Sequence, residues 1–451
     1  MAGLFALSIN PQKYKGNFLK DLFWGTFYQQ HFSEEYSGLA TCSQGKIKTP
    51  KPKKGLFRAA FTKALEGLEG TEGIGYCGPT EEPFSQDSRL GKFSICFSGN
   101  LINHSELLER LKNLGHTFER EDDIEIIAKL LVQGKKIVDG IKKMEKEIQG
   151  SYSLLILTPE GIYASRSPDA HWPLVLGQKD GVVVAASESG GFSNLGFKLI
   201  RDLEPGEIIL MKNGRFEIED KIISERIQFC SFVWVYSAFP SGIFEGILTS
   251  LVRKRLGAAL ARRDIVNGFI PDIVTPIPDS GRMHALGYFE EFCRQINEGK
   301  IDRIPFYDEL LLKYPYAGRS FTRRTEEARD LEADVKMLTN EGDYRNKEVA
   351  VVDDSIVRGT QIRKKLVPKL RRLRMRGIHL RIANPEILSH CPWGKTLQKG
   401  EALAVQMPSK EERIKFLGVE TLEYNTVEDL LKAIGLPAEK LCLDCSLKSN
   451  L

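Results

Sequence analysis

Long apolar runs are missing from this chain of 451 residues, and its net charge is small. No stretch approaches the roughly 20 consecutive apolar residues that cross a bilayer, and the N-terminus does not resemble a signal peptide. We therefore expect no membrane partner and a cytoplasmic location. The formal net charge of +4 argues neither for nor against nucleic acid, so no nucleic-acid partner is assigned.

Cysteine is also scarce, with eight residues in the chain. In a reducing compartment they are thiols or metal ligands rather than disulfides. Cys442 and Cys445 form a lone Cys-x-x-Cys pair, which is a weak indication of metal binding. Cys230 and Cys391 complete a set of four, but their wide separation does not fit the short paired spacings of a zinc ribbon. The others are expected to be small buried apolar residues: Cys42, Cys77, Cys96 and Cys293.

Two halves with different patterns follow one another along the chain. Short β-like runs with helices between them fill residues 1–225, as in an α+β layered domain. From Pro271 onward strands and helices alternate, which is typical of a parallel, doubly wound α/β sheet. The length allows two or three domains with substantial cores, and we place two, at 1–225 and 226–451. The basic segment 46–54 is expected to be a surface loop.

Particular elements are expected in each half. The strands of the first half are 3–9, 93–97, 151–157, 182–187 and 207–211, and its helices are 105–114 and 124–133. The strands of the second half are 273–276, 349–352 and 379–382, and its helices are 283–297 and 361–374.

The most informative segment is 349–360, Val-Ala-Val-Val-Asp-Asp-Ser-Ile-Val-Arg-Gly-Thr. Its small apolar residues predict a buried strand that ends at the carboxylates of Asp353 and Asp354, and a Ser/Gly/Thr loop then leads into a basic helix. Backbone N–H groups of such a loop can surround a phosphate, while the carboxylates hold hydroxyls or a hydrated cation. The alternative is an ordinary strand–turn–helix corner with a solvated acid pair.

This run resembles the phosphoribosyl pyrophosphate (PRPP) signature of type I phosphoribosyltransferases, in the wording of the glutamine PRPP amidotransferase family. The resemblance implies that Asp353 and Asp354 bind the ribose hydroxyls and help to hold Mg²⁺. It also implies a Mg²⁺ role for Ser280, within a Pro-Asp-Ser-Gly element that the family shares. The implied PRPP phosphate-binding residues are Ser355, Ile356, Val357, Arg358, Gly359 and Thr360.

A second segment resembles the flexible flap that covers PRPP in this family. Residues 318–321 and Arg329 match its Gly-Arg-(Thr/Ser)-Phe…Arg pattern, and Lys336 matches the lysine of a Val-Arg-x-Lys pattern. The resemblance adds Arg329 and Lys336 to the acid pair as catalytic candidates. Asp334 stands where the family has Arg, and an acid beside a leaving pyrophosphate should cost affinity or rate.

The four separated cysteines resemble the ligand set of the family's iron–sulfur subgroup. The resemblance implies a [4Fe–4S] cluster held by the thiolates of Cys230, Cys391, Cys442 and Cys445. Such a cluster would tie the C-terminal segment to the core. A structural Zn²⁺ and four plain buried thiols are the alternatives.

The first residues, Met-Ala-Gly-Leu-Phe-Ala-Leu, resemble the start of a class II (Ntn-type) glutamine amidotransferase. Segments 166–177 and 185–189 add to this resemblance, with substitutions in the first. In the family an N-terminal cysteine is the nucleophile, and its freed amine is the general base. Here that position is Ala2. The first cysteine is Cys42, so removal of a short leading segment is not expected to expose a replacement.

Other glutaminase positions are altered too. Gly78 replaces the arginine that grips the substrate carboxylate, and Ser98 replaces an asparagine donor of the oxyanion hole. Gly99 keeps the backbone donor, and Asp123 matches the acid that binds the glutamine amine. Losing one oxyanion donor typically costs about 10²–10³ in rate, and losing the nucleophile removes the covalent route. We therefore expect a degenerate glutaminase site.

The resemblance covers residues 2–445 and implies an α+β Ntn-type (αββα) domain followed by an α/β type I phosphoribosyltransferase domain. The expected activity is transfer of an amine, ammonia above all, to C1 of PRPP with release of pyrophosphate, as in purine synthesis, with Mg²⁺ and a [4Fe–4S] cluster as cofactors. The alternative is a non-catalytic paralogue that binds PRPP or nucleotides and regulates an active amidotransferase. A homo-oligomer is expected, or a hetero-assembly with an active amidotransferase or glutaminase.

Overall fold

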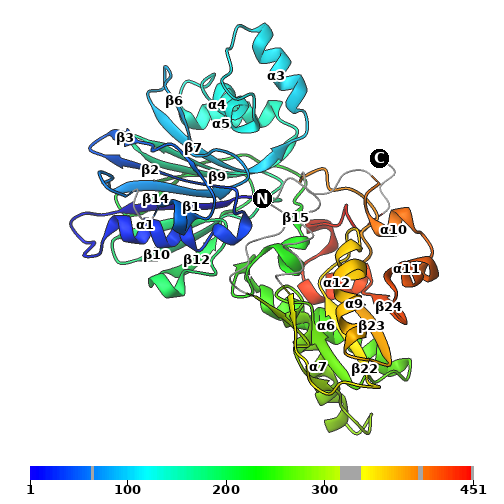
Figure 1. Ribbon diagram of the computed structural model, residues 1–451. Helices are drawn as coiled ribbons and strands as arrows, with labels where there is room; N and C mark the ends of the chain where they lie inside the picture. The colour runs from blue at the N-terminus through cyan, green and yellow to red at the C-terminus, as the bar shows by residue number, and fades with distance from the viewer. Residues whose placement is uncertain (62–64, 315–336, 395–399, 448–451) are drawn as a thin grey trace.

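Two lobes make up the protein (Figure 1). The computed structural model describes residues 1–61, 65–314, 337–394 and 400–447. The N-terminal half forms the lobe at the upper left of the view and the C-terminal half forms the one at the lower right. Among the described residues, no helix combines the length and apolar character needed to span a membrane.

Two antiparallel sheets form the core of the N-terminal half. The first has the order β12–β10–β11–β1–β5–β2–β3, with β4 also paired to β2, and the second has the order β14–β13–β9–β8–β7–β6. The first contains β1 (Gly3–Ile9), β2 (Tyr36–Ser43), β3 (Lys46–Lys48), β4 (Lys53–Lys54), β5 (Glu72–Gly78), β10 (Val175–Lys179), β11 (Val182–Ala186) and β12 (Lys198–Asp202). The second contains β6 (Phe84–Gln86), β7 (Phe93–Leu101), β8 (Gly150–Thr158), β9 (Gly161–Arg166), β13 (Glu207–Lys212) and β14 (Arg215–Lys221).

Alternating side chains build the layers of this half. On β1, Leu4 and Ala6 pack between the two sheets, while Phe5 and Leu7 pack on the side of helix α1 (Phe18–Phe27), because successive strand residues point to opposite faces. Helices α3 (His104–Asn113), α4 (Asp123–Leu131) and α5 (Ile137–Glu147) supply the apolar cluster on the second sheet. The short elements are η1 (Gln30–Phe32), α2 (Phe57–Phe61) and η2 (Ser193–Leu195). This is the αββα layering expected for the first half.

A five-stranded parallel sheet forms the core of the C-terminal half, in the order β19–β18–β22–β23–β24. Its strands are β18 (Ile273–Pro276), β19 (Phe306–Tyr307), β22 (Glu348–Asp353), β23 (Gly377–Ile382) and β24 (Thr421–Tyr424). Ala350 and Val352 pack on the side of α6 (Thr249–Val266) and α7 (Arg282–Asn297). Val349 and Val351 face the side covered by the π-helical turn η5 (Ile362–Leu366), α9 (Val367–Arg372) and α11 (Lys410–Leu417). The α/β expectation is therefore confirmed.

Smaller elements connect the two halves. Strand β15 (Phe229–Cys230) pairs in parallel with β25 (Leu441–Cys442), which brings the end of the chain to the junction. The expected domain boundary at 225/226 falls between the end of β14 and the start of β15. The other elements of this half are η3 (Val233–Ser237), β16 (Ile243–Phe244), β17 (Ile247–Leu248), β20 (Leu311–Lys313), β21 (Met337–Thr339), α10 (Leu403–Gln406), α12 (Val427–Ile434) and η6 (Ala438–Lys440).

Three expectations need correction. Segment 46–54 is not a plain loop, because β3 forms a hairpin with β2 across Gln44 and Gly45, both at positive φ, and buries Ile47 between exposed lysines. The expected helix 361–374 is a π-helical turn followed by α9, which ends at Arg372. Cys293 is only partly buried, unlike Cys42, Cys77 and Cys96.

Candidate functional site

The acid pair lies at the carboxyl end of the central strand β22. Asp353 is its last residue, and both Asp353 and Asp354 are buried, with exposed fractions of 8% and 4%. The Asp354 N–H donates to Asp353 Oδ1 at 2.9 Å, and the Ser355 hydroxyl donates to Asp354. Burial raises the pKa of both carboxyl groups, and the charge of Asp354 raises the pKa of Asp353 further. These carboxylates therefore carry a cost that a bound cation would relieve.

Ser280 joins this pair from the loop after β18. Its hydroxyl interacts with both carboxyl groups and lowers the pKa of each. The loop is held against β22 because Ile277 N–H donates to Val352 O at 2.9 Å and Gly281 N–H donates to Ile277 O at 2.9 Å. A Cβ at position 281 would lie 2.4 Å from Val352 O, so only glycine permits this approach. The peptide bond between Pro278 and Asp279 in the same loop is cis.

The candidate phosphate loop, residues 355–360, follows the acid pair. Gly359 has φ +70°, a conformation that favours glycine. The loop is fixed from the side of α10, because Leu403 N–H donates to Val357 O at 2.7 Å and Arg358 pairs with Glu401 at 2.6 Å. Ile356 is buried in the core of this half. Contacts of Ile356, Val357 and Arg358 therefore hold the middle of the loop in place.

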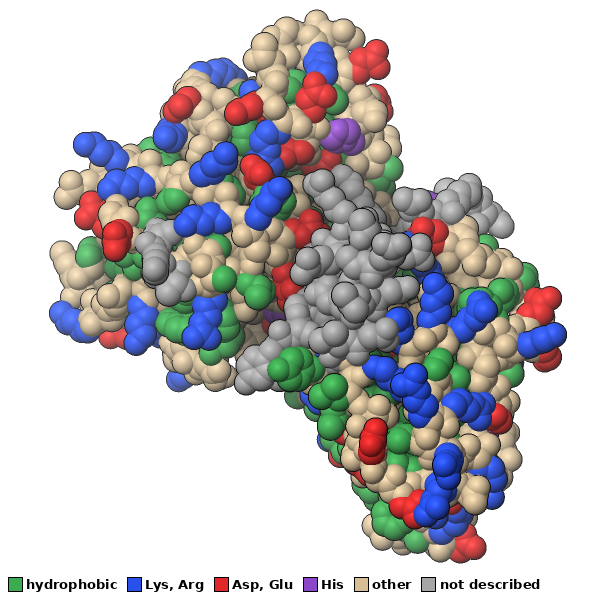
Figure 2. Space-filling view, viewed as in Figure 1, with side chains coloured by type: hydrophobic (Ala, Val, Ile, Leu, Met, Phe, Trp, Pro, Cys, Tyr) green, Lys and Arg blue, Asp and Glu red, His purple; other side chains and the backbone are tan. Residues whose placement is uncertain are grey.

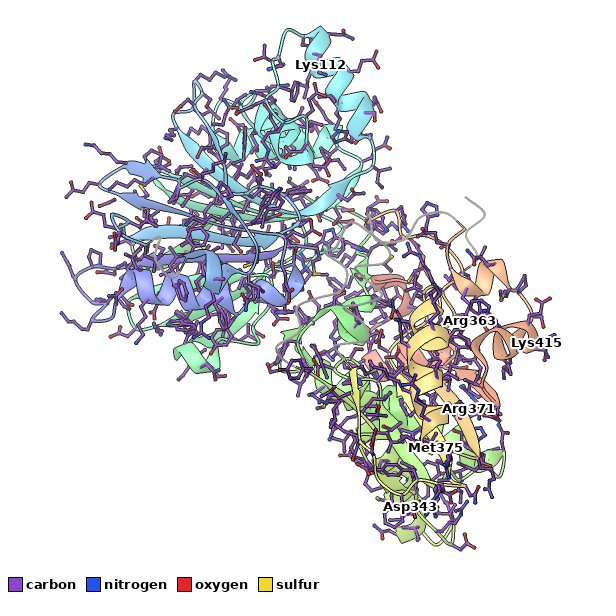
Figure 3. All side chains as sticks on the ribbon, viewed as in Figure 1. Lys112, Asp343, Arg363, Arg371, Met375 and Lys415 are labelled. Atoms are coloured by element: carbon purple, nitrogen blue, oxygen red, sulfur yellow. The ribbon has the colours of Figure 1, made fainter. Side chains whose placement is uncertain are left out.

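The elements after this loop have a basic exposed face (Figure 2). Arg363, Lys364, Arg371, Arg372 and Arg374 are all exposed. Figure 3 shows Arg363 and Arg371 on this face, with Lys415 of α11 beside them. The positive potential of this surface lies next to the loop proposed for a phosphate.

An Mg²⁺ ion fits the oxygen donors of this region. Two carboxylates and a hydroxyl are the ligand types that Mg²⁺ prefers, and the ion completes its shell with water and substrate phosphates. The nearby Arg253 cation attracts Asp354, but its guanidinium donates to three backbone carbonyls, those of Trp234, Tyr236 and Ala238. Arg253 therefore does not neutralise the acid pair by direct hydrogen bonds, and the carboxylates of the pair can bind a divalent ion. The expected flap residues 318–321, Arg329, Asp334 and Lys336 lie outside the described residues.

Ala2, which the sequence predicts to stand in the place of a glutaminase nucleophile, lies just before β1. Ala2 is 3% exposed, and its N–H donates to Ser98 Oγ at 3.0 Å. The Ser187 hydroxyl donates to Ala2 O at 3.1 Å. Ser98 thus holds the beginning of β1 in place. Gly99 lies against β8, because a Cβ there would be 2.2 Å from Ser151 O.

The space beside Gly78 is filled by a tyrosine. A Cβ built on Gly78 would lie 1.9 Å from the hydroxyl oxygen of Tyr76, whose side chain is fully buried. The Tyr76 hydroxyl is hydrogen-bonded to Thr80 Oγ1 at 2.7 Å, which holds the ring there. A side chain at position 78 and this tyrosine rotamer exclude one another. Tyr76 could not be picked out from the sequence, because the replacement of an arginine by Gly78 does not show which side chain lies beside it.

Asp123 has internal partners. Its carboxylate lies 2.6 Å from His104 Nδ1 and accepts the Leu101 N–H at 3.3 Å. Its expected role in binding an amine stays a prediction. On β7, Asn100 Nδ2 donates to Pro392 O at 3.0 Å, so the loop that carries Cys391 contacts the strand of Ser98 and Gly99.

The four candidate ligand cysteines come together from three segments. Cys230 and Cys442 are register partners in the β15–β25 pair. Leu388 and Ser389 donate their N–H groups to Cys445 O at 2.8 and 3.3 Å, which ties the segment before Cys391 to the C-terminal pair. All four thiols are free, and burial together with their mutual repulsion raises the pKa of Cys230, Cys442 and Cys445.

This donor set fits an iron–sulfur cluster better than a single ion. Within the described ranges, no three His, Cys, Asp or Glu residues converge closely enough to hold one metal ion. A [4Fe–4S] cluster is larger than one ion and keeps its four thiolates farther apart. Cys442 is buried and the other three cysteines are partly buried, and thiols that disfavour one another's ionisation are in keeping with such a group, which stabilises thiolates directly.

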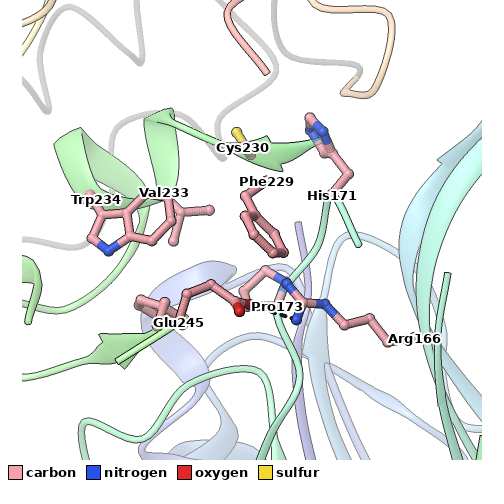
Figure 4. Close-up of a pocket in the computed structure, with 9 residues that line it drawn as sticks. Arg166, His171, Pro173, Phe229, Cys230, Val233, Trp234 and Glu245 are labelled. Atoms are coloured by element: carbon pink, nitrogen blue, oxygen red, sulfur yellow. Dashed lines mark hydrogen bonds and ion pairs between the residues drawn. The ribbon is translucent and has the colours of Figure 1, made fainter. Parts of the chain in front are cut away.

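A small pocket, with little more room than a water molecule needs, lies at the junction of the two halves (Figure 4). Arg166 crosses it to pair with Glu245 at 2.7 Å and lies over the Phe229 ring. The pocket is lined by Arg166, His171, Pro173, Phe229, Cys230, Val233, Trp234, Phe244 and Glu245. One wall of this pocket is therefore Cys230, a candidate cluster ligand.

Comparisons with known proteins bear on the whole chain. The family model of a glutamine amidotransferase domain matches residues 78–194. An amidophosphoribosyltransferase of Methanocaldococcus jannaschii is 34% identical, over 95% of this chain and 93% of that protein. The enzyme of the same name from Bacillus subtilis is 30% identical, over 92% and 86%.

A solved structure gives the same result for the fold. The glutamine PRPP amidotransferase of B. subtilis, complexed with ADP and GMP, superimposes with a TM-score of 0.87 at 28% identity. The match covers 99% of this chain and 96% of that one. With a full-length relative above 30% identity and one fold throughout, the chain belongs to the amidophosphoribosyltransferase family.

Proposed function

We propose that this protein transfers ammonia to C1 of PRPP with release of pyrophosphate and does not hydrolyse glutamine. The observation that carries the proposal is the buried pair Asp353 and Asp354, with Ser280 beside it, at the carboxyl end of β22. Ligands of open α/β sheets bind at this edge. The altered start of β1 supports the second part of the proposal.

The residues around the acid pair would divide the work of binding. Asp353 and Asp354 accept hydrogen bonds from the ribose hydroxyls, and backbone N–H groups of residues 355–360 hold the 5′-phosphate. The acid pair and Ser280 would hold Mg²⁺, which would supply positive charge to the leaving pyrophosphate. The basic surface around Arg363 and Arg371 raises the local concentration of the polyanionic substrate. By family resemblance, Arg329 and Lys336 act at the pyrophosphate.

The chemical step needs no side-chain nucleophile. The lone pair of ammonia attacks C1 while the bond between C1 and the pyrophosphate oxygen breaks, and pyrophosphate leaves with the bonding electrons. The new amine then loses one proton to water. Catalysis depends on positioning and on stabilising the charge of the leaving group, which fixed polar groups in a buried site provide.

Glutamine hydrolysis is absent in this proposal because each part of that machinery is replaced. Ala2 has no nucleophilic atom, and Ser98 is engaged by the Ala2 N–H. Tyr76 fills the place next to Gly78 from which an arginine would grip the substrate carboxylate. Ammonia would come from solution or from a glutaminase on another chain in a hetero-assembly.

The four cysteines would hold a [4Fe–4S] cluster that ties the C-terminal segment to the junction. The support is the meeting of Cys230, Cys391, Cys442 and Cys445 from three segments of the chain. Bound iron accepts the four thiolates as ligands and offsets the cost of ionising them in a buried place.

The test uses protein purified without oxygen and supplied with Mg²⁺ and PRPP. Pyrophosphate release is followed with ammonium, with glutamine, and with neither. Release with ammonium alone is the expected result. Release with glutamine would overturn the silent glutaminase, and no release in any condition would overturn the transferase.

A second candidate function is a non-catalytic paralogue that regulates or assembles with an active amidotransferase. It is favoured by Asp334 in place of an arginine and by the altered glutaminase site. PRPP binding measured by calorimetry without any turnover would select it.

A further inference from the structure

A short segment of the C-terminal half, residues 239–245, lies on the N-terminal half, and we call it the strap. It follows η3, contains β16, and continues through β17 into α6, which packs on β22. Three backbone N–H groups of the strap donate to side chains of the N-terminal half. Those of Phe239, Ile243 and Glu245 bond Glu188 Oε2, Ser189 Oγ and Asp202 Oδ2, at 2.9, 3.0 and 2.9 Å. The strap therefore helps to fix how the two halves sit together.

Two carboxyl groups meet one guanidinium at the end of the strap. The Arg166 guanidinium pairs with Glu245 Oε1 at 2.7 Å (Figure 4). Its other hydrogen bonds within the described part of the chain go to backbone carbonyls, those of Trp172, Ala170 and Leu203. The second carboxyl group is that of Asp202, which accepts the Glu245 N–H. One cation thus lies between two acids and is bonded to only one of them.

Asp202, the last residue of β12, has a hydrogen bond on only one of its two oxygens. Oδ2 accepts the Glu245 N–H, whereas Oδ1 is covered by protein and has no hydrogen-bond partner among the described residues. A carboxylate in this place would be poorly solvated, and it would lie beside the charge of Glu245. A protonated carboxyl group avoids most of that cost.

The charged groups around Asp202 come from three elements. Burial raises the pKa of Asp202, Glu245 on the strap raises it further, and Arg166 on β9 lowers it. On the strand of Asp202 itself, Arg201 is held by Glu207 through both terminal nitrogens, at 2.6 and 2.7 Å. The register partner of Asp202 on β10 carries no charge. The pKa of Asp202 is raised to about 7 as a result.

We propose that Asp202 and Glu245 form a proton-controlled latch between the two halves of the protein. With a proton on Asp202 the latch is closed, and the strap stays on the N-terminal half. Loss of that proton places two negative charges beside one guanidinium, which favours release of the strap at Glu245. The latch is independent of the PRPP chemistry and of the four cysteines, because none of its groups belongs to either site.

The direction of the pH effect follows from proton binding. Once the latch opens, Asp202 faces water and has an ordinary carboxyl pKa of about 4. The closed form therefore binds the proton more tightly than the open form. The proportion of open latch should rise about tenfold per pH unit from about pH 5 up to the pKa of Asp202, and it should be constant above that.

The test is hydrogen exchange of the strap amides in the full-length protein, followed by mass spectrometry from about pH 5 to about pH 8.5 and corrected for the intrinsic rate. The variant is Asp202→Asn, which keeps an acceptor for the Glu245 N–H and cannot ionise. The matched control is Asp180→Asn, at an exposed position in the turn between β10 and β11.

Protection of the strap in the wild type and in the control is expected to fall about tenfold per pH unit up to about pH 7 and then to level off. Asp202→Asn should keep nearly constant protection over the same range. Should Asp202→Asn not fold, Glu245→Gln serves instead. The fall should then level off at lower pH, because Glu245 no longer raises the pKa of Asp202.

Two outcomes would overturn the latch. A wild-type profile that does not change with pH shows that no proton controls the strap. An unchanged slope in Asp202→Asn assigns the titration to another group, such as His31, which lies 3.3 Å from Glu188 at the other end of the strap. Neither result touches the PRPP chemistry, which the pyrophosphate assay measures separately.

Discussion

The site at the start of β1 and the site at the end of β22 differ in how their polar groups are satisfied. Around Ala2 and Gly78 the altered positions are filled or bonded by neighbours: Ser98 accepts the Ala2 N–H and Tyr76 covers Gly78. At Asp353 and Asp354 two carboxyl groups lie buried side by side, and burial raises the pKa of both, which makes it costly for both to be ionised. Burying the acid pair costs free energy when no ligand is bound. The groups around Ala2 and Gly78 have partners within the protein and carry no such cost. The contrast is what the proposed function predicts, with ligand chemistry at the acid pair and no glutaminase chemistry at the start of β1.

The largest expected effect comes from Asp354→Asn. It removes one of the two carboxylates proposed to hold the ribose and the cation, so ammonium-dependent pyrophosphate release should fall by about 10²–10³. Asp343→Asn is the control, because Asp343 is exposed and pairs only with Arg345 among the ion pairs of the described residues. Equal rates for wild type and Asp354→Asn would remove the acid pair from the mechanism.

Gly281→Ala should have the next largest effect. The new Cβ would meet Val352 O at 2.4 Å, so the loop must move and carry Ser280 away from the acid pair. PRPP turnover should fall by roughly tenfold or more, since small displacements of positioned groups are costly. Gly268→Ala is the control, strained at φ +71° but with open space around it. Loss of turnover in both variants would point to stability rather than to loop position.

The stability of the N-terminal half should depend on pH through Glu82, which lies in that half. Burial raises the pKa of Glu82, between β5 and β6, to about 8. Because the folded form holds its proton while the unfolded form loses it near pH 4.5, this contribution to stability is present at low pH. It is lost as the pH rises through about 8. The loss is on the order of 2–4 kcal/mol.

Hydrogen exchange of β5 and β7 amides would measure this half alone. Glu82→Gln keeps the shape of the side chain and carries no charge. The protection of these amides, corrected for the intrinsic exchange rate, should therefore depend less on pH and be higher at pH 8 than in the wild type. Parallel pH profiles for the two proteins would show that Glu82 ionises in the same range folded and unfolded.

The smallest effect is expected from restoring the nucleophile. Ala2→Cys should give no glutamine-dependent pyrophosphate release, because Tyr76 still occupies the space beside Gly78. The ammonium-dependent rate should stay at the wild-type value, because Ala2 takes no part in the proposed transfer of ammonia to PRPP. Ala2→Ser is the control for a polar atom without thiol chemistry. Glutamine-dependent release by Ala2→Cys would show that the pocket is intact.

The fold class of each half was predicted from the order of its strand-like and helix-like segments along the chain. The continuous run of small apolar residues at 349–352 and the acids that follow it predict β22 and its end, because these signals lie within a few residues of one another. The hairpin at β3 was not predicted. Its strand has one buried residue, Ile47, between two exposed lysines, which is too short a pattern to indicate a strand. The flap candidates Arg329 and Lys336 stay predictions, as do the roles of the acid pair and the cysteines.

By itself the sequence determined the two-part architecture, the position of the acid pair and the absence of a nucleophile at Ala2, because residue type and local spacing decide each of these. Only the tertiary structure decided that Tyr76 fills the space beside Gly78 and that Asn100 reaches Pro392, 292 positions away. The same holds for the stacking of His171 on Trp393. These contacts depend on how two halves pack, and no local pattern encodes which distant side chain will occupy a given space.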